Sequence, residues 1–338
     1  PDSYEDWLVE RVGRPVYELV LQPIASKIWG EPRDLAWQLA ARRVAVPSLF
    51  ELVRQTLLGR GGRPVISADT FFYPEGGVGT ICEAMAEHLR RAGGEIRVDH
   101  ALEALDIVDG RVQGLRFEGR PAVPVTTDEA VVSTIHVQQL ATCLRPPAPV
   151  EVLAAARGLR NRHLILVSLV VRRPRLTEDC WLFFPEARFV FNRLSEQKAF
   201  DAGMGPSDRT LVTAEITCGP EDSLWTEPDT RLTDLVSTQI EEAGLCRRDE
   251  VVQGFVVRVP AVYQVYDRGY AERLAAVLSH LDEIGNLYTV GRQGLFNYVG
   301  TMDCMDMGMV TAEFLGHGRP RSEWPSVRAR FDTYLVID

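Results

Sequence analysis

The stretch YPEGGVGTICEAMAEHLRRAGGEIRV, residues 73–98, contains the pattern that decides the fold. Its first glycines lie in one loop, apolar residues recur at helical spacing over 80–92, and a Gly-Gly pair then ends the periodicity. Residues 65–72 before the loop and 95–98 after the helix have the composition of strands. The stretch therefore predicts a strand, a glycine loop, a helix and a second strand in succession.

The glycine loop partly matches the fingerprint of a dinucleotide-binding turn. In that fingerprint, glycines in the pattern G-x-G-x-x-G follow a strand directly, so that the backbone can approach a pyrophosphate where the helix begins. Gly77 and Gly79 fit, but Cys82 takes the third position. Asp99 lies at the offset usual for a ribose-binding acid. Two other interpretations stay open: a tight turn that packs a helix closely on a sheet, or one wall of a cofactor pocket built mostly by other segments.

The segments on either side of this stretch predict helices first and a hairpin afterwards. Capping residues and apolar periodicity favour helices over most of 1–60, including one that opens at Ser48. Asp109-Gly110 lies between two alternating runs and predicts a tight hairpin, because such a turn needs positive φ angles. Residues 129–135 have the pattern of a buried strand. Together they predict an α+β module.

Prolines at 146, 147 and 149 mark the predicted boundary between this module and a sheet-rich region. Residues 160–260 are rich in strand patterns, with one helix expected near 231–243. The longest apolar run, 164–171, is far shorter than the roughly 20 residues of a spanning helix, so we expect a buried strand and no transmembrane segment. Two more helices are expected, around 274–281 and from about Met302.

The composition is that of an ordinary globular protein of 338 residues, enough for two domains or one large interleaved domain. A formal net charge of -10 argues against a nucleic-acid partner, since nothing would attract a phosphate backbone. The first residues are acidic and amphipathic, unlike a secretory leader, so we expect a cytoplasmic protein. The dispersed cysteines and histidines predict no protein-bound metal site.

Residues 287–315 form the second candidate site. An apolar strand leads into Gly291-Arg292-Gln293-Gly294, and a helix begins some residues later. Free backbone N–H groups and the helix dipole could meet an anionic or electron-rich ligand atom there, and Arg292 could pair with a phosphate. The methionines at 302, 305 and 309 fit core packing better than a cofactor contact.

Two further clusters carry polar and aromatic residues. Arg258 with Tyr263, Tyr266 and Tyr270 could line a polar substrate pocket, or could be surface aromatics in a loop. The run FNRLSEQKAF at 191–200 has the composition of a solvated turn. No nucleophile stands beside a plausible base, so a cofactor would have to carry the chemistry of an enzyme.

Four blocks together resemble a known superfamily: YEDWLVERVGRPVYELVLQPIASKIWG, YPEGGVGTICEAMAEHLRRAGGEI, RLSEQKAF, and YQVYDRGYAERL followed by NLYTVGRQGLFNY. They are similar to the flavin-dependent amine-oxidase-like superfamily, which includes protoporphyrinogen oxidase, phytoene desaturase and UDP-galactopyranose mutase. The resemblance spans nearly the whole chain. It implies an α+β or α/β fold in which a Rossmann-like FAD-binding domain interleaves with a substrate domain of mixed sheet and helices.

The resemblance also implies where each domain lies. The predicted parts are a helical part of the substrate domain at 1–64, a second FAD-binding segment at 65–145, a sheet-rich substrate domain at 146–286, and a C-terminal FAD-binding segment at 287–338. The family's main pyrophosphate-binding loop lies in an N-terminal strand, loop and helix, which we expect to be missing here. The FAD-binding domain would then be incomplete, or a separate N-terminal polypeptide would complete it.

Carried over by the resemblance, the cofactor residues fall into three groups: Leu102, Ser133 and Thr134 toward the adenine or pyrophosphate; Gly291, Arg292 and Gly294 toward the ribityl chain; and Met302, Met307 and Gly308 on a helix facing the flavin. The substrate-lining candidates are Arg258, Tyr263, Tyr266 and Tyr298. Relatives commonly have RYNNMDHS where residues 297–304 read NYVGTMDC, so only Tyr298 survives there before Met307-Gly308 resumes the pattern.

We therefore expect an FAD-dependent oxidoreductase that moves a hydride from a small or sugar-like molecule to the flavin. A non-redox sugar rearrangement like that of UDP-galactopyranose mutase is the enzymatic alternative. A flavin-free binding homologue, a degenerate relative or a fragment is the alternative outside enzymes. The predicted partner is a small-molecule substrate; the catalytic residues stay unassigned.

Overall fold

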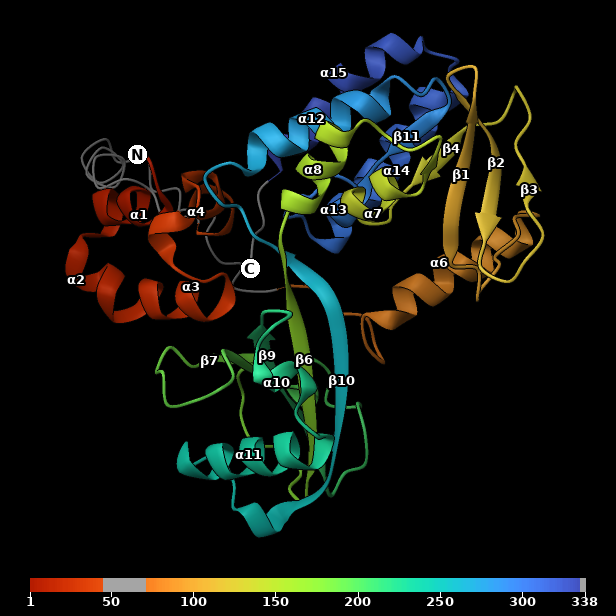
Figure 1. The fold of residues 1–338 in the computed structure, drawn as a ribbon. Helices are drawn as coiled ribbons and strands as arrows, with labels where there is room; N and C mark the ends of the chain where they lie inside the picture. The colour runs from red at the N-terminus through yellow and green to blue at the C-terminus, as the bar shows by residue number, and fades with distance from the viewer. Residues whose placement is uncertain (45–70, 335–338) are drawn as a thin grey trace, which may run out of the picture.

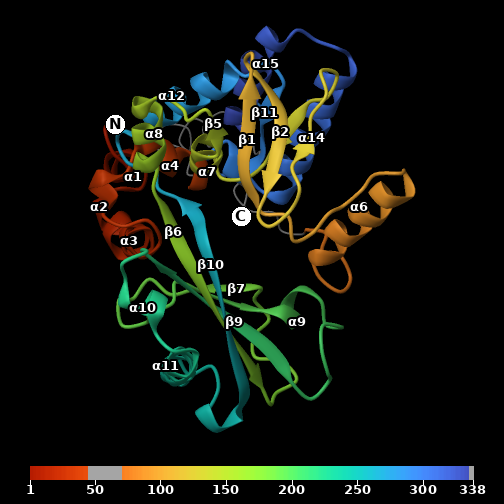
Figure 2. The same cartoon turned by 45° about the vertical axis from the view of Figure 1, so that its right-hand side comes forward.

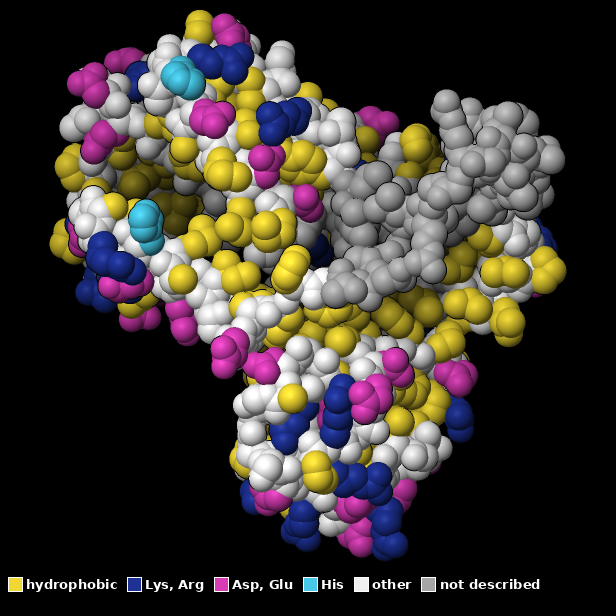
Figure 3. Space-filling model, turned by 180° about the vertical axis from the view of Figure 1, so that it is seen from behind, with side chains coloured by type: hydrophobic (Ala, Val, Ile, Leu, Met, Phe, Trp, Pro, Cys, Tyr) yellow, Lys and Arg dark blue, Asp and Glu magenta, His cyan; other side chains and the backbone are white. Residues whose placement is uncertain are grey.

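The computed structural model describes residues 1–44 and 71–334, and it has two bodies (Figures 1 and 2). The lower body, residues 161–264, is built on one five-stranded sheet. The upper body comprises most of the other described residues, with most of the helices and two smaller sheets. The loop 71–77 packs on the lower body, where Phe71 stacks on Trp181 and Tyr73 lies against Phe200. From behind, hydrophobic side chains gather in a hollow of the upper body and in a belt where the two bodies meet (Figure 3).

The N-terminal layer of the upper body is helical, as its sequence pattern predicts. α1 (Tyr4–Val12) begins after Ser3, whose hydroxyl accepts a hydrogen bond from the Asp6 N–H at 3.1 Å. The elements that follow are α2 (Arg14–Val16), a π-helix (Tyr17–Leu21), α3 (Gln22–Ile28), a 3₁₀ turn (Pro32–Asp34) and α4 (Trp37–Arg43). The helix predicted from Ser48 lies outside the described residues.

The stretch at 73–98 forms its helix but not its strands. α6 (Gly79–Arg91) matches the prediction, yet it has no buried residue, and Met85 and Leu89 on its apolar side are about half exposed. The strand predicted at 95–98 is wrong, and so is its counterpart at 71–72; residues 65–70 lie outside the described part. A strand needs a neighbour for its N–H and C=O groups, and no described strand runs beside these residues.

The predicted hairpin is confirmed. Asp109 and Gly110 both have positive φ, 50° and 70°, and join β1 (Leu102–Val108) to β2 (Arg111–Phe117). β3 (Val123–Pro124) and β5 (Leu144–Arg145) complete a four-stranded sheet in the order β3-β2-β1-β5.

A second, two-stranded sheet of the upper body joins segments far apart in the sequence. β4 (Val131–Ser133), which is shorter than the predicted strand, pairs in parallel with β11 (Leu287–Thr289). The remaining helices of the upper body bury the apolar residues of β11, Leu287 and Tyr288, but leave Val132 of β4 exposed. They are α7 (Val137–Thr142), α8 (Val150–Gly158), α12 (Tyr270–Asp282), α13 (Gly291–Gly294), α14 (Thr301–Gly316) and α15 (Trp324–Ala329), with 3₁₀ turns at Arg321–Glu323 and Arg330–Thr333. Asp282 at the end of α12 accepts two hydrogen bonds of 2.7 Å from Arg328, which fixes α15 to α12.

The lower body is an antiparallel sheet with a helix on one face. Its strands are β6 (Asn161–Val171), β7 (Trp181–Phe183), β8 (Arg193–Glu196), β9 (Thr210–Cys218) and β10 (Val251–Gln264), in the order β10-β6-β9-β8-β7. The expected strand at 164–171 is thus confirmed within β6. α11 (Asp229–Glu242) buries Leu232, Val236 and Ile240 against the sheet. Short elements fill the connections: α9 (Gln197–Phe200), α10 (Ser223–Thr226) and a 3₁₀ turn at Arg248–Glu250.

The predicted domain boundaries stay a prediction, but the packing shows which elements share a core. Buried residues of α8 and α12 belong to the same hydrophobic cluster as the N-terminal helices. A separate cluster lies within the lower body and joins its sheet, α11 and the phenylalanines of the segment between β7 and β8. α8 and α12, which fall inside the predicted sheet-rich segment 146–286, therefore pack with the upper body.

One glycine of β10 lets α11 approach the sheet. A Cβ atom at Gly254 would collide with Cγ2 of Thr233 on α11 and lie 3.1 Å from Cδ2 of Leu169 on β6. We expect Gly254→Ala to lower the free energy of unfolding by about 1–3 kcal/mol through overpacking. Denaturant unfolding tests this, and the change should shrink in a Thr233→Ala background, which removes the colliding methyl group. An unchanged midpoint in Gly254→Ala would contradict the close packing.

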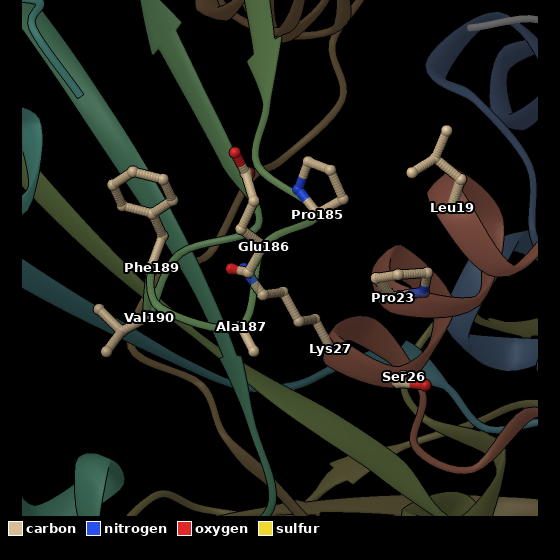
Figure 4. A pocket seen from close by; sticks show the side chains of 9 residues that line it. All are labelled: Leu19, Pro23, Ser26, Lys27, Pro185, Glu186, Ala187, Phe189 and Val190. Atoms are coloured by element: carbon tan, nitrogen blue, oxygen red, sulfur yellow. The ribbon is translucent and has the colours of Figure 1, made fainter.

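Lys27 on α3 joins the two bodies. Its ammonium donates hydrogen bonds to the carbonyl oxygens of Phe184 and Glu186 at 2.7 Å and of Phe191 at 3.1 Å. Figure 4 shows the side chain reaching from the helix toward the 185–190 loop, beside a hollow of about 510 Å³. All three donors of the ammonium are thereby used on one loop of the lower body. Burial, opposed in part by the Glu186 carboxylate, lowers the pKa of Lys27 to about 8.

This lowered pKa predicts how stability changes with pH. Between about 8 and the ordinary value of 10.5 the unfolded chain binds more protons at Lys27 than the folded one, so stability should rise with pH there. Because the side chain is only half buried, we expect a rise of about 1 kcal/mol after allowing for solvent screening. Urea unfolding across this pH window should show the rise in the wild type and not in Lys27→Met. The same change of the free energy of unfolding with pH in the wild type and in Lys27→Met would contradict this prediction.

Candidate functional site

A cavity of about 460 Å³ opens beyond the carboxyl ends of β4 and β11. The chain leaves β4 at Thr134 and β11 at Gly291-Arg292, and both turns line the cavity. Parallel strands present such ends on the same edge of a sheet, which is where ligands bind in open α/β folds. α14 forms the opposite wall. Four predicted cofactor residues, Thr134, Gly291, Arg292 and Gly308, are thus brought together by the fold.

Two glycines shape the turn from β11 into α13. Gly291 has φ +81°, a left-handed conformation that glycine adopts without strain. Gly294 is buried, and a Cβ atom there would lie 2.9 Å from the Thr289 hydroxyl oxygen and 3.2 Å from the Ser133 carbonyl oxygen. Gly294 therefore allows α13 to pack tightly on β4 and is absent from the cavity wall.

The wall made by α14 combines a row of small residues with the larger side chains of Thr311 and Leu315. A Cβ atom at Gly308 would meet nothing within 4 Å, so this glycine faces open space. Cys304, Gly308 and Ala312 follow one another at intervals of four residues and all line the cavity. This spacing places small side chains on one helix face and was the sequence signal for Cys304 and Ala312, which our site prediction missed. A planar ligand group could lie directly against this face.

Arg292 both lines the cavity and holds the segment before α14. Its Nη1 donates to the Val299 carbonyl oxygen at 3.0 Å. Its guanidinium carbon lies 4.9 Å from the ring centroid of Tyr298 and 6.0 Å from that of Tyr263. The guanidinium is thus fixed in position at the edge of the cavity.

The first turn of α14 already carries a negative charge. The Gly300 N–H donates to the Asp303 carboxylate at 2.7 Å, which caps the helix. The negative charge of Asp303 offsets the positive end of the helix dipole. The N-terminus of α14 therefore attracts an anionic ligand atom less strongly than the sequence suggested.

The other predicted cofactor residues lie outside the cavity wall. Met307 is fully buried in a cluster around Trp324, whereas Met302 is 69% exposed at the start of α14. Ser133 is buried within β4, and its carbonyl oxygen accepts from the Val290 N–H at 2.9 Å. Leu102 begins β1 in the neighbouring sheet. Their proposed contacts with a cofactor stay predictions.

Two of the predicted substrate-lining tyrosines are core residues. Tyr298 is fully buried, donates to the Gln264 carbonyl oxygen at 2.6 Å and accepts from Trp29 Nε1 at 2.6 Å. Tyr266 is also buried and donates to the Phe296 carbonyl oxygen at 2.9 Å. Burial raises the pKa of both phenols above the ordinary value. Their hydroxyls are therefore neutral structural groups with partners inside the protein.

Arg258 does not join the tyrosines. It lies in β10 and donates to the Trp225 carbonyl oxygen at 2.9 Å and to the Asp229 carboxylate at 2.6 Å, which ties the strand to α10 and α11. Tyr263 is partly buried beside Arg292, and burial raises its pKa. None of the four predicted residues lines the cavity; Tyr263, which packs against the core cluster, is linked to it only through Arg292.

A family model described as flavin containing amine oxidoreductase matches residues 36–269. The chain belongs to this family. The fold is also similar to that of several solved structures. A reduced UDP-galactopyranose mutase matches 99% of this chain and 71% of its own, with 19% identity and a TM-score of 0.79.

A putative protoporphyrinogen oxidase from Exiguobacterium sp. 255-15 matches 94% of this chain and 67% of its own, with 23% identity and a TM-score of 0.70. Putrescine oxidase bound to putrescine matches 93% and 68%, with 15% identity and a TM-score of 0.59. The predicted superfamily and fold class are confirmed.

Within residues 1–44 and 71–334, no helix has the length and apolar character needed to cross a bilayer. The same residues hold no group of three or more potential metal ligands. The cytoplasmic location stays a prediction.

The residues of the cavity fit a flavin. Its walls are mainly apolar, the glycine face of α14 leaves room for a flat ring, and Arg292 offers fixed donors at the edge. The volume lies in the range of small-molecule and cofactor pockets.

Gly308 gives this fit a direct test. Alanine is favoured over glycine within a helix, and its methyl group would enter only open space, so Gly308→Ala should raise the free energy of unfolding by about 0.5–1 kcal/mol. The same methyl group narrows the cavity, and we expect the variant to retain less flavin. Gly316→Ala, at the end of the same helix and outside the cavity wall, is the matched control. Equal flavin retention in both variants would contradict a ring lying against Gly308.

Proposed function

We propose that this protein is an FAD-dependent oxidoreductase that accepts a hydride from a small or sugar-like substrate. The observation that carries the proposal is the cavity where the β4 and β11 ends meet the small-residue face of α14. The family match supports a flavin, which supplies a two-electron acceptor when bound. The identity of the flavin as FAD and the substrate class are the finer parts of the proposal.

The chain's own residues would position the cofactor rather than react with it. Gly308 and Ala312 offer a flat apolar surface, and Gly291 directs the chain around the cavity mouth. Arg292 would place a positive charge near an electron-rich edge of the ligand, where it favours added negative charge. Tyr263, beside Arg292, is our candidate for the substrate side.

The visible spectrum of the natively purified protein tests the proposal. We expect a flavin spectrum, and mass spectrometry of the released cofactor should identify FAD. A colourless protein that stays colourless after incubation with excess FAD would contradict the cofactor assignment. Anaerobic addition of candidate alcohols, amines and sugars should then bleach the flavin if one of them is a hydride donor.

A mutase-like sugar rearrangement is the second candidate, because the reduced mutase structure superposes over 99% of this chain. The two candidates differ in their need for reductant. Turnover of a nucleotide sugar only after dithionite reduction, without net oxidation, would favour the mutase. Flavin bleaching by a substrate in the absence of dithionite would favour the oxidoreductase.

We further propose that a separate polypeptide completes the cofactor site. α6 has no buried residue, and within the described residues β4 pairs with one strand only. As a result, the apolar side chains of Met85, Leu89 and Val132 are exposed among the described residues. Denaturing mass spectrometry of the native material should reveal a second chain, and a single chain that binds FAD fully would contradict this part.

A further inference from the structure

A second cavity, of about 340 Å³, lies on the boundary between the two bodies and shares no lining residue with the cofactor cavity. The loop 30–35, between α3 and α4, forms one side. The end of α8, the start of β6 and Gly219-Pro220 form the other. Its floor is apolar, made of the buried side chains of Trp29, Leu35, Leu159 and Val265. A short hydrocarbon body could therefore rest on this floor.

Three arginines stand on the side of α8 and β6: Arg157, Arg160 and Arg162. Arg162 reaches deepest, because its side chain is only 23% exposed. Its Nε–H is fully buried and has no acceptor among the described residues, while its Nη2 is 3.6 Å from the Asp222 carboxylate, beyond hydrogen-bond distance. The Nε–H is closed to solvent and therefore to a ligand, so an incoming oxyanion would meet the Nη groups, whose ion pair with Asp222 is too long for a hydrogen bond.

The other two arginines strengthen the same side. Arg160 is 3.3 Å from Asp267, which also pairs with Arg273. Arg157 is exposed at the mouth and forms no ion pair or hydrogen bond within the described residues. The positive charge on this side therefore exceeds that of its two neutralising carboxylates.

Two carboxylates face the arginines from the opposite side. Glu31 and Asp34 line the cavity mouth, and their side chains form no ion pair with any described residue. Positive and negative groups thus stand on opposite sides of an open space without reaching each other. A ligand that satisfies both sides needs an acidic group at one end and a cationic donor at the other.

We propose that this cavity binds a small zwitterion: a carboxylate directed at Arg162 and Arg157, an ammonium directed at Glu31 and Asp34, and a short apolar body over Trp29 and Leu159. The site is independent of the flavin chemistry. A molecule with only one of the two charges gains only one of the two attractions, so an acid without the amine and an amine without the acid should both bind more weakly than the zwitterion.

A length series of ω-amino acids tests the proposal on the full protein. Glycine, β-alanine, 4-aminobutanoate, 5-aminopentanoate and 6-aminohexanoate are titrated by calorimetry, with butanoate and butylamine as controls that carry one charge each. We expect one chain length to bind saturably with a Kd of about 1 mM or tighter, and each control to bind at least about tenfold more weakly. No saturable binding anywhere in the series would overturn the proposal, and butanoate binding as tightly as 4-aminobutanoate would also do so.

Variants assign the two ends of the ligand. Arg162→Gln should weaken the best binder about tenfold or more, and Glu31→Gln combined with Asp34→Asn should do the same. Arg157→Gln keeps the test valid if the Arg162 variant fails to fold, because Arg157 is exposed. Arg231→Gln, an exposed arginine on α11, is the matched control and should bind like the wild type. Unchanged affinity in the arginine variants would contradict the contact of the ligand carboxylate, and unchanged affinity in the carboxylate variant would contradict the contact of the ligand ammonium. Either result would overturn the proposal of a zwitterionic ligand.

Discussion

The hydroxyl of Tyr298 joins three segments on which the rest of the structure depends. It accepts from Trp29 in the helical layer and donates to the Gln264 carbonyl oxygen at the end of β10, while its own backbone leads into α14. The group is fully buried, and leaving such a partner unpaired costs about 1–3 kcal/mol. One phenol therefore sets how the helical layer, the long sheet and the C-terminal segment stand to one another. The ring of Tyr298 also lies 4.9 Å from the guanidinium carbon of Arg292, which lines the cavity against α14.

Cations tie elements together, both between the two bodies and within each, by donating hydrogen bonds to carbonyl oxygens and carboxylates. Lys27 spends its three donors on the loop between β7 and β8, and Arg258 ties β10 to the helices below. Arg292 does the same within the upper body while also facing the cavity. These charges serve structure, whereas the second cavity also has charged groups at its mouth, Arg157, Glu31 and Asp34, that form no ion pair with any described residue.

The sequence predicted elements whose causes are local. Asp109-Gly110 is enough to specify its turn. The apolar run within β6 is enough to predict a buried strand, and the apolar periodicity of α6 is enough to predict a helix. The strand expected at 95–98 failed because a strand depends on a neighbour, which composition does not reveal. The sequence predicted Tyr266, Tyr298 and Arg258 as pocket residues. An aromatic residue or an arginine near a loop gives the same sequence pattern whether its side chain contacts a ligand or the protein core. The meeting of Thr134, Gly291, Arg292 and Gly308 followed from the family resemblance, and the small-residue spacing of α14 could have added Cys304 and Ala312.

The pairing of β4 with β11 has a consequence for the order of folding. All of β6 to α12 lies between the two strands in the sequence, yet the cavity exists only when they are side by side. The strands of the lower body are closer to one another in sequence than β4 is to β11. The lower body can therefore form during synthesis before β11 is available to pair with β4. The ligand site is therefore among the last parts of the molecule to assemble, and a nascent chain exposes the apolar residues of β4 until β11 has emerged.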